Sequence, residues 1–303
     1  AGDPHSVFLE IFFKALKKKK FKNPIILIVN KKILSNQLRL LKFNFKINEL
    51  NKNLKFNEIK KHCINFINVN FESKYVNKYI KNSFEIAIKL IKQNKNFSLI
   101  NGPINKKKFL KNKYFGITEY LGSKTGSLKK VVMLIYSKKI SVSPITTHIP
   151  LKKVHLNISK NKIINQVKLI NNFYKSKFKI KPNIAITGLN PHCESNFASS
   201  EEDKIIIPAI NLLKKQKYKV SGPYPADTIF LKQNMKNYDV IVGMYHDQVL
   251  SPIKSILGFN AINLTIGLPF VRISPDHGPN VKMFGKNLSD PQSLIEAIKF
   301  FEN

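Results

Sequence analysis

Cysteine is scarce in this chain of 303 residues: the sequence has two, Cys63 and Cys193, and neither belongs to a CxxC pair. A disulfide framework and a cysteine-rich zinc site are therefore excluded, and a reduced, cytoplasmic setting is expected. No apolar run reaches the roughly 18 residues that a membrane-spanning helix needs. The first segment also lacks the basic, apolar and small-residue order of a secretory signal, so neither membrane insertion nor secretion is expected.

Acidic residues are also few, with 18 Asp and Glu against 52 Lys and Arg and a formal net charge of +34. Such an excess can indicate a nucleic acid or an anionic membrane as partner. The lysines are spread along the whole chain, however, and no zinc-finger spacing, RNA-binding signature or basic heptad accompanies them. We interpret the charge as compositional bias. A basic nucleic-acid-binding protein without catalysis is kept as the alternative from another functional class.

Several familiar motifs are missing. The sequence holds no GxGxxG after a predicted strand, no Walker A loop, no GxSxG and no HExxH. A Rossmann-type dinucleotide site is therefore not indicated, and neither is a P-loop, a hydrolase nucleophile elbow or a zincin centre.

What is present is an alternation of short β-branched runs with longer segments of helical spacing. Strands are expected at 24–30, 97–102, 129–137, 139–147, 182–188, 238–244 and 261–267, and helices at 75–93, 161–178, 201–216 and 290–302. Residues 7–16 carry one apolar helical face, and Asp290 with Pro291 suits the start of the last helix. This alternation predicts an α/β protein with a mostly parallel sheet and two domains that share a continuous core.

Four of the seven histidines, His148, His192, His246 and His277, follow predicted strands. In α/β folds, ligands gather in the loops at the carboxyl ends of strands. Taken singly, each histidine is more simply a structural residue. Taken together, three imidazoles with a carboxylate or a substrate oxygen make a reasonable divalent-metal site.

A second group of residues suits an anionic substrate. Lys106 lies in a strand–loop–helix segment, NGPINKKKF, and Lys254, Asn263 and Arg272 lie near the ends of later elements. A single lysine in so basic a chain is more simply a solvated surface charge, whereas arginine is rare here and Arg272 ends an apolar run. Asp227, flanked by prolines, is either part of a rigid turn or an oriented carboxylate.

Eight of these segments resemble, in order, the motifs of the 4-hydroxythreonine-4-phosphate dehydrogenase family of pyridoxal phosphate biosynthesis. They are NGPINK, GITEYL, TTHIPL, GLNPHCES, GPYPADTIF, YHDQVLSPIK, INLTIGLPFVR and DHG, and the resemblance covers nearly the full chain. It implies two α/β/α domains similar to isocitrate dehydrogenase, residues 1–125 with 272–303 and residues 126–271. The second domain would carry most metal ligands and the dimer contact. The active site would lie in the interdomain cleft at a homodimer interface.

The resemblance also implies a reaction. The family oxidises 4-hydroxythreonine 4-phosphate with NAD or NADP to a β-keto acid, which loses carbon dioxide to give 3-amino-2-oxopropyl phosphate. A divalent ion (Mg, Zn or Co) would hold the substrate hydroxyl and stabilise the alkoxide from which hydride departs. By motif, its ligands are His148, His192 and His246, the last reaching across from the partner subunit. His277 lies in the DHG motif and is not one of the ligands.

By the same resemblance, Thr118, Lys254, Asn263 and Arg272 are the implied substrate contacts. The candidate catalytic residues are Lys106 and the two carboxylates Asp247 and Asp227, either of which could orient a ligand or relay a proton.

The sequence departs from the family pattern at several places. Ile117 stands where the family has a substrate-contacting histidine, and Val249 stands where it has glycine. GDPHSVFLE replaces GDPAGIGPE, and DHGPN replaces DHGTA. The three implied metal ligands are present, whereas residues implied to surround the substrate differ from the family pattern. A dehydrogenase of the same fold that acts on another phosphorylated hydroxy acid is therefore a further alternative.

Overall fold

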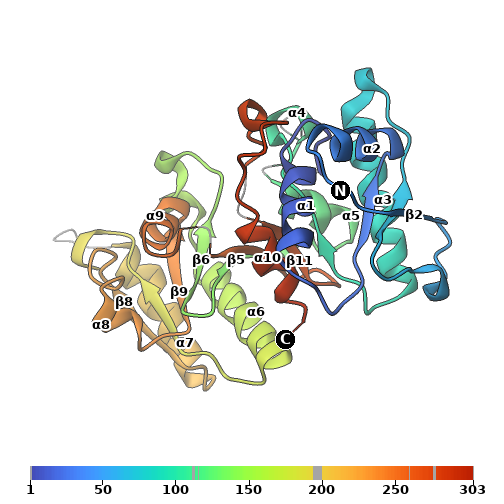
Figure 1. The fold of residues 1–303 in the computed structure, drawn as a ribbon. Coiled ribbons are helices and arrows are strands. Elements are labelled where there is room, and N and C mark those ends of the chain that lie inside the picture. Colours follow the sequence, from blue (N-terminus) through green and yellow to red (C-terminus); the bar gives the residue numbers. More distant parts are fainter. Residues whose placement is uncertain are drawn as a thin grey trace. The chain divides into compact units, whose positions relative to one another are not determined.

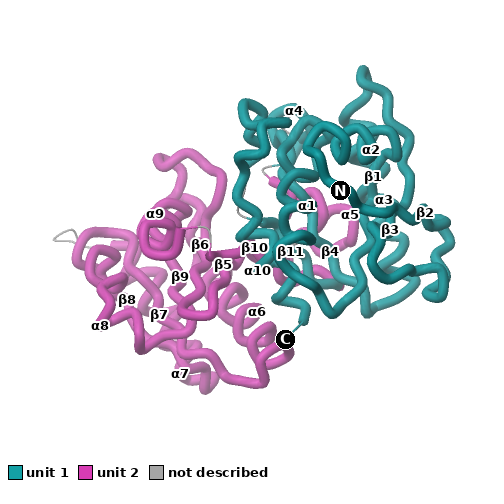
Figure 2. Tube along the Cα trace, in the orientation of Figure 1, with its two compact units in different colours: residues 1–114, 270–303 teal, residues 115–269 magenta. Residues whose placement is uncertain are grey.

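The computed structural model describes residues 2–110, 113–114, 116–193, 200–258, 260–275 and 278–302, the side chain of Lys129 excepted. The chain separates into two compact units, residues 1–114 with 270–303 and residues 115–269 (Figure 2). The sequence places residues 115–125 in the first domain. In the structure the helix at Ile117–Lys124 packs on the turn at Leu128–Lys130, within the second unit.

Unit 1 contains a three-stranded parallel sheet of order β1-β3-β2, and β4 pairs in parallel with β11 (Figure 1). The strands are β1 (Ile26–Val29), β2 (Ile47–Leu50), β3 (Ile64–Asn68), β4 (Leu99–Ile100) and β11 (Arg272–Pro275). The helices are α1 (Phe8–Lys18), α2 (Lys31–Leu40), α3 (Val76–Gln93), α4 (Lys106–Leu110) and α10 (Gln292–Lys299). Short 3-10 turns lie at Phe56–Glu58, Ser73–Tyr75 and Val281–Met283.

The core of unit 1 is organised around α1, which packs against α2 and α10. Its apolar face buries Phe8, Ile11, Phe12 and Phe13, as the helical spacing of the sequence predicts. Gly102, in the loop after β4, lies directly under this helix. A Cβ added there would be 2.4 Å from the ring of Phe8, so only glycine lets the loop approach α1 this closely.

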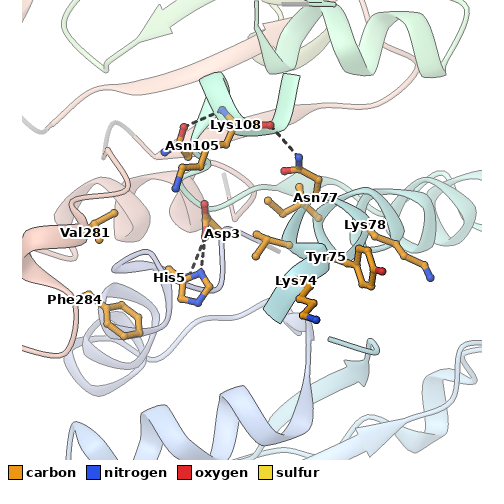
Figure 3. A pocket seen from close by; sticks show the side chains of 12 residues that line it. Asp3, His5, Lys74, Tyr75, Asn77, Lys78, Asn105, Lys108, Val281 and Phe284 are labelled. Carbon is orange, nitrogen blue, oxygen red and sulfur yellow. Dashed lines mark hydrogen bonds and ion pairs between the residues drawn. The ribbon is translucent and has the colours of Figure 1, made fainter. Parts of the chain in front are cut away.

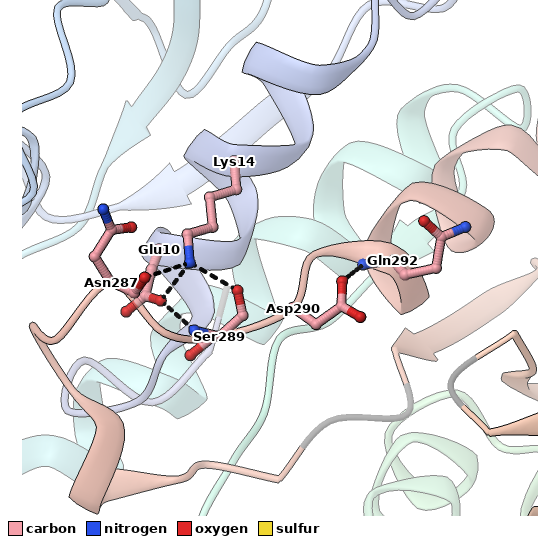
Figure 4. A network of polar contacts seen from close by, with 6 residues as sticks. All are labelled: Glu10, Lys14, Asn287, Ser289, Asp290 and Gln292. Carbon is pink, nitrogen blue, oxygen red and sulfur yellow. Dashed lines mark hydrogen bonds and ion pairs between the residues drawn. The ribbon is translucent and has the colours of Figure 1, made fainter.

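A buried polar network fixes the segment before α10 onto α1 (Figure 4). Glu10 is buried, and its Oε1 accepts hydrogen bonds from Lys14 Nζ at 3.0 Å and from the Ser289 N–H at 2.6 Å. Lys14 Nζ also donates to the carbonyl oxygens of Asn287 and Ser289, each at 2.8 Å. A buried carboxylate needs such donors, so the network explains why one acidic residue is tolerated in this apolar helix.

The described part of unit 2 contains six strands, in the order β10-β5-β6-β9-β7-β8. β5 is antiparallel to both of its neighbours, and β6, β9, β7 and β8 are mutually parallel. The strands are β5 (Val132–Tyr136), β6 (Ser141–Thr146), β7 (Ile184–Thr187), β8 (Val220–Tyr224), β9 (Val240–Tyr245) and β10 (Ile262–Ile266). The helices are α5 (Ile117–Lys124), α6 (Lys160–Phe178), α7 (Ile207–Lys215), α8 (Lys232–Met235) and α9 (His246–Leu257). Shorter turns lie at Leu128–Lys130, Leu151–Lys153, His155–Asn157 and Pro191–Cys193, and a π-helical turn at Glu202–Ile206 precedes α7.

Helices cover both faces of this sheet. Val142 of β6 packs in one apolar cluster with Val249 and Ile253 of α9. The alternate residue Ser141 accepts a hydrogen bond from the hydroxyl of Tyr174 on α6, at 2.8 Å. Because successive side chains of a strand point to opposite faces, α9 and α6 lie on opposite sides of β6. β7 and β9 are buried on both faces and therefore read as nearly continuous apolar runs.

The α/β class and the mostly parallel pairing are confirmed. The seven expected strands correspond to β1, β4, β5, β6, β7, β9 and β10, and the expected helices to α1, α3, α6, α7 and α10. The carboxylate of Asp290 accepts the Gln292 N–H at 2.9 Å, although α10 itself begins at Gln292. No helix in the described part of the chain has both the length and the apolar character needed to cross a membrane.

The close packing at Gly102 gives a direct test of unit 1. Gly102→Ala is expected to lower the free energy of unfolding by about 1–3 kcal/mol, because the new methyl overlaps the Phe8 ring. Gly278→Ala is the matched control, since among the described residues a Cβ there meets nothing closer than Asn280 Oδ1 at 3.4 Å. Thermal unfolding of both variants measures the difference, and adding Phe8→Leu to Gly102→Ala should restore part of the loss. Equal melting temperatures for the two glycine variants would contradict the packing.

Candidate metal and substrate site

Two of the predicted metal ligands lie side by side in unit 2. β6 and β9 run parallel, with Thr146 opposite Tyr245 as the last pair of the register. His148 follows β6 by two residues, and His246 is the first residue of α9, directly after β9. The centroids of the two imidazole rings are 5.6 Å apart. The expected loop between strand and helix is absent, because α9 begins where β9 ends.

Asp247 contacts the ring of its neighbour. Nδ1 of His246 lies 2.7 Å from Oδ1 of Asp247, and the side chains are 31% and 78% exposed. A carboxylate at Nδ1 favours the tautomer that carries the proton there, which leaves Nε2 as the free electron-pair donor. Asp247, predicted as a catalytic residue, is thus placed to orient His246.

Gln248 is a structural residue of this site that the sequence did not reveal. Its Oε1 accepts hydrogen bonds from the Met244 N–H at 2.7 Å and from Thr187 Oγ1 at 2.9 Å, and its Nε2 donates to the Gly188 carbonyl at 2.8 Å. One amide side chain therefore ties the ends of β7 and β9 to the first turn of α9. A glutamine that follows His-Asp is the only signal in the sequence, and its role depends on the strand order.

Val249, one of the departures from the family pattern, is a packing residue. It is fully buried, and a Cβ added at Gly243 would lie 2.3 Å from its Cγ1. The valine therefore fits because the adjacent strand carries glycine.

His192 is held separately. It is exposed, in a 3-10 turn, with a left-handed backbone (φ 56°, ψ 7°). The described residues contain no group of three His, Cys, Asp or Glu side chains close enough to hold a metal ion. The structure thus brings His148 and His246 together but does not add His192 to them. The segment 194–199 after it lies outside the described residues.

The loop before His192 is anchored by a buried carboxylate. Oε1 of Glu202 accepts the N–H groups of Leu189 at 2.7 Å and Asn190 at 2.9 Å, and Oε2 accepts from Asn190 Nδ2 at 2.8 Å. Burial raises the pKa of Glu202, but the hydrogen bonds from Asn190 and Leu189 outweigh it, so the pKa lies below its ordinary value. Glu202 thereby stays charged and fixes this loop.

Two predicted substrate contacts and one unexpected carboxylate lie on α5 and β10. Thr118 Oγ1 is 3.1 Å from Thr265 Oγ1, and Asn263 projects from the same face of β10 as Thr265. Oδ1 of Asn263 and Oε2 of Glu119 are buried without a hydrogen-bond partner in the described part of the chain. Ile117, in place of the family histidine, is buried and offers no polar contact.

The remaining predicted residues are more dispersed. Lys254 is exposed on α9, eight positions after His246, which is about 12 Å along a helix axis. Asp227 is exposed in the turn after β8, and Lys106 is exposed at the start of α4. Arg272 is buried in unit 1, where its Nε donates to Asn101 Oδ1 at 2.6 Å. His277 lies outside the described residues.

Unit 1 contains a pocket of about 710 Å³ that sequence reasoning missed, because its walls come from separate segments (Figure 3). Its lining residues are Asp3, His5, Lys74, Tyr75, Val76, Asn77, Lys78, Ile80, Asn105, Lys108, Val281 and Phe284. The three lysines have no ion pair among the described residues, and Tyr75 is 55% exposed. Positive charge beside apolar and aromatic walls suits a phosphorylated ligand with a flat ring.

Comparison with known proteins gives consistent results. The family model described as pyridoxal phosphate biosynthetic protein PdxA matches residues 20–301. A 4-hydroxythreonine-4-phosphate dehydrogenase of Sulfurihydrogenibium sp. (strain YO3AOP1) is 40% identical over 310 residues, covering 98% of this chain and 94% of that protein. The crystal structure of 4-hydroxythreonine-4-phosphate dehydrogenase from Klebsiella pneumoniae superimposes with a TM-score of 0.84 at 25% identity, over 99% and 95% of the two chains. Isocitrate dehydrogenase from Methylococcus capsulatus shares the fold at a TM-score of 0.50 and 9% identity, over 92% and 85%, which confirms the expected likeness of fold.

The anchoring role of Glu202 predicts a pH-dependent stability. Glu202→Gln is expected to lower the free energy of unfolding at pH 7 by about 1–3 kcal/mol, because the three hydrogen bonds to the carboxylate are weakened or lost. Since the folded pKa is depressed, the contribution is complete above the unfolded pKa and is lost as pH falls through the folded pKa. Melting temperatures of native and variant protein should therefore differ at pH 7 and converge as the pH falls through the folded pKa of Glu202. Glu201→Gln, which replaces a single charged acceptor of Asn190 Nδ2 by a neutral amide, is the control with a smaller effect. A gap that widens in acid would refute the assignment.

Proposed function

This chain belongs to the family of pyridoxal phosphate biosynthetic protein PdxA, and on that premise we propose that it is a 4-hydroxythreonine-4-phosphate dehydrogenase. It would use NAD or NADP and a divalent metal ion to oxidise the substrate alcohol to a β-keto acid, which decarboxylates to 3-amino-2-oxopropyl phosphate. The observation that carries the proposal in this chain is the pair of imidazoles at 5.6 Å where β6 and β9 end.

The donor set of this pair fits a divalent ion. Metal–nitrogen bonds of about 2.0–2.1 Å place two imidazoles of one tetrahedral site with their ring centroids about 5–6 Å apart. The 5.6 Å spacing is of that size, and the carboxylate on Nδ1 of His246 leaves Nε2 for the ion. Imidazole ligands favour zinc or cobalt over magnesium. His148 and His246 would hold the ion, with His192 as the third ligand implied by the family.

When bound, the ion would lower the pKa of the substrate hydroxyl and stabilise negative charge on its oxygen. The chain's own residues would orient the rest of the substrate. Asn263 offers a buried acceptor oxygen for a donor group, and Thr118 presents a hydroxyl. Lys254 and Arg272 supply cations for the phosphate and carboxylate.

The substrate could instead be another phosphorylated hydroxy acid. The observation that favours this alternative is the burial of Ile117, which removes a polar contact that the family provides with histidine. Metal chemistry at the histidine pair would be the same for both substrates, so turnover of each distinguishes them.

For the cofactor, we assign the adenosine part to the unit 1 pocket. Its volume of about 710 Å³ and its lysines suit an adenine nucleotide, and the absence of GxGxxG agrees with a site of a different kind.

A homodimer is part of the proposal, and the resemblance implies that His246 is supplied to the partner's site. Large apolar side chains are exposed on unit 2, including Leu151 at 70% and Leu156 at 73%, in the segment that follows His148. A surface of this kind suits a subunit contact. The proximity of His148 and His246 in one chain instead favours an arrangement in which each subunit completes its own pair.

The activity test follows reduction of NAD or NADP with 4-hydroxythreonine 4-phosphate. Turnover is expected with zinc or cobalt, and removal of the metal with a chelator should abolish it. His148→Ala and His246→Ala should each lower kcat/KM by about 100-fold or more. Glu85→Gln, an exposed substitution in unit 1, should leave it unchanged. Absence of turnover with metal present would refute the proposed substrate, and turnover of another phosphorylated hydroxy acid would establish the alternative.

Subunit complementation decides how the two histidines are shared. Co-expressed His148→Ala and His246→Ala chains, carrying different tags, form heterodimers that tandem purification isolates. If His246 crosses to the partner, one of the two sites is intact, so the heterodimer should recover about half of the native activity per dimer. A pair completed within each chain would leave both sites defective, and no activity would return.

A further inference from the structure

Glu119 of α5 is a half-buried acidic residue, and one of its carboxylate oxygens is fully buried. Its Oε2 is inaccessible to solvent, and its carboxylate has no hydrogen bond or ion pair in the described part of the chain. Among the described residues, Glu10 also has a buried, unpartnered carboxylate oxygen, but its second oxygen accepts hydrogen bonds from Lys14 and Ser289. An unpaired buried carboxylate oxygen is costly, so Glu119 needs a donor.

His148 is a potential donor close to this carboxylate. A Cβ built on Gly116 would lie 2.9 Å from Glu119 Oε2 and 3.5 and 3.6 Å from Cε1 and Nδ1 of His148. The carboxylate and the Nδ1–Cε1 edge of the ring therefore flank the same point. Because position 116 is glycine, no side chain separates them, and rotation of the flexible glutamate side chain can close the remaining gap.

The same arrangement is already formed at the neighbouring ring, where Asp247 contacts Nδ1 of His246 at 2.7 Å. Histidines that bind metals generally donate their second ring N–H to a carboxylate or carbonyl, which fixes the tautomer and strengthens the ligand. We propose that Glu119 is the positioning carboxylate of the metal site: it accepts the Nδ1–H of His148 and directs Nε2 toward the ion. This inference rests on the proposed metal site and adds a residue outside its ligand set.

The first test is metal affinity, measured by competition with a chromophoric chelator for zinc. Glu119→Gln keeps the shape of the side chain but removes its charge. Glu119→Asp keeps the charge but shortens the side chain by one methylene, so that the carboxylate cannot reach His148. Each is expected to weaken zinc binding by about 10- to 100-fold, and to change the visible spectrum of the cobalt-loaded protein. Glu85→Gln, exposed in unit 1, is the control and should bind like the native protein.

The outcomes separate this inference from the proposed function. Native zinc affinity in both folded Glu119 variants would overturn the role of Glu119 and leave the metal site standing. Failure of the native protein to bind zinc or cobalt would overturn both.

A measurement on the native protein does not depend on the variants folding. Nitrogen-15 spectra of the zinc-loaded chain should show the His148 ring protonated at Nδ1 and metal-bound at Nε2. Metal bound at Nδ1 of His148 would refute the proposal. Gly116→Ala offers a further check, because its methyl would lie between the two groups and should weaken zinc binding in the same direction.

Discussion

The parallel register of β6 with β9 is the constraint on which the site in unit 2 depends. It pairs Ser141 with Val240 and Thr146 with Tyr245, so both strands end at the same level. The hydroxyl of Thr146 donates to the Met244 carbonyl at 2.8 Å and locks that end of the pair. A slip of one residue would turn the apolar residues of β6 away from α9 and move His148 away from His246. The burial of both strands therefore fixes the position of His148 beside His246 as well as the fold.

Around that register, carboxylates and amides set the orientation of the loops. Asp247 holds the ring of His246, Gln248 ties the start of α9 to β7, and Glu202 fixes the backbone before His192. In a chain with 18 acidic residues against 52 basic ones, several of the acidic groups are thus used inside or beside one site. The large positive charge is distributed over the whole chain and needs no partner of its own, although it favours phosphorylated ligands.

Much of the fold could be predicted from the sequence, because buried parallel strands are continuous apolar runs and α3, α6 and α10 have clear helical spacing. β2, with the sequence INEL, and β11, with RISP, were not predictable: each has four residues and too few apolar ones to stand out. The pairing of His148 with His246 depends on strand order, which single loops do not reveal. The sequence alone does not reveal the role of Gln248 or the unpartnered oxygen of Glu119, since both depend on contacts that form only in the folded chain. His192, Lys254 and Asp227 remain predictions, because the described contacts do not bring them to the pair.

The central claim is that the paired imidazoles of unit 2 bind one divalent ion through Nε2. X-ray absorption spectroscopy of the zinc-loaded protein tests it most directly, since imidazole ligands give a characteristic multiple-scattering pattern. The account predicts at least two imidazole nitrogens at about 2.0–2.1 Å from the zinc, and their loss in His148→Ala. A zinc shell of oxygen alone, or a spectrum that His148→Ala leaves unchanged, would contradict it.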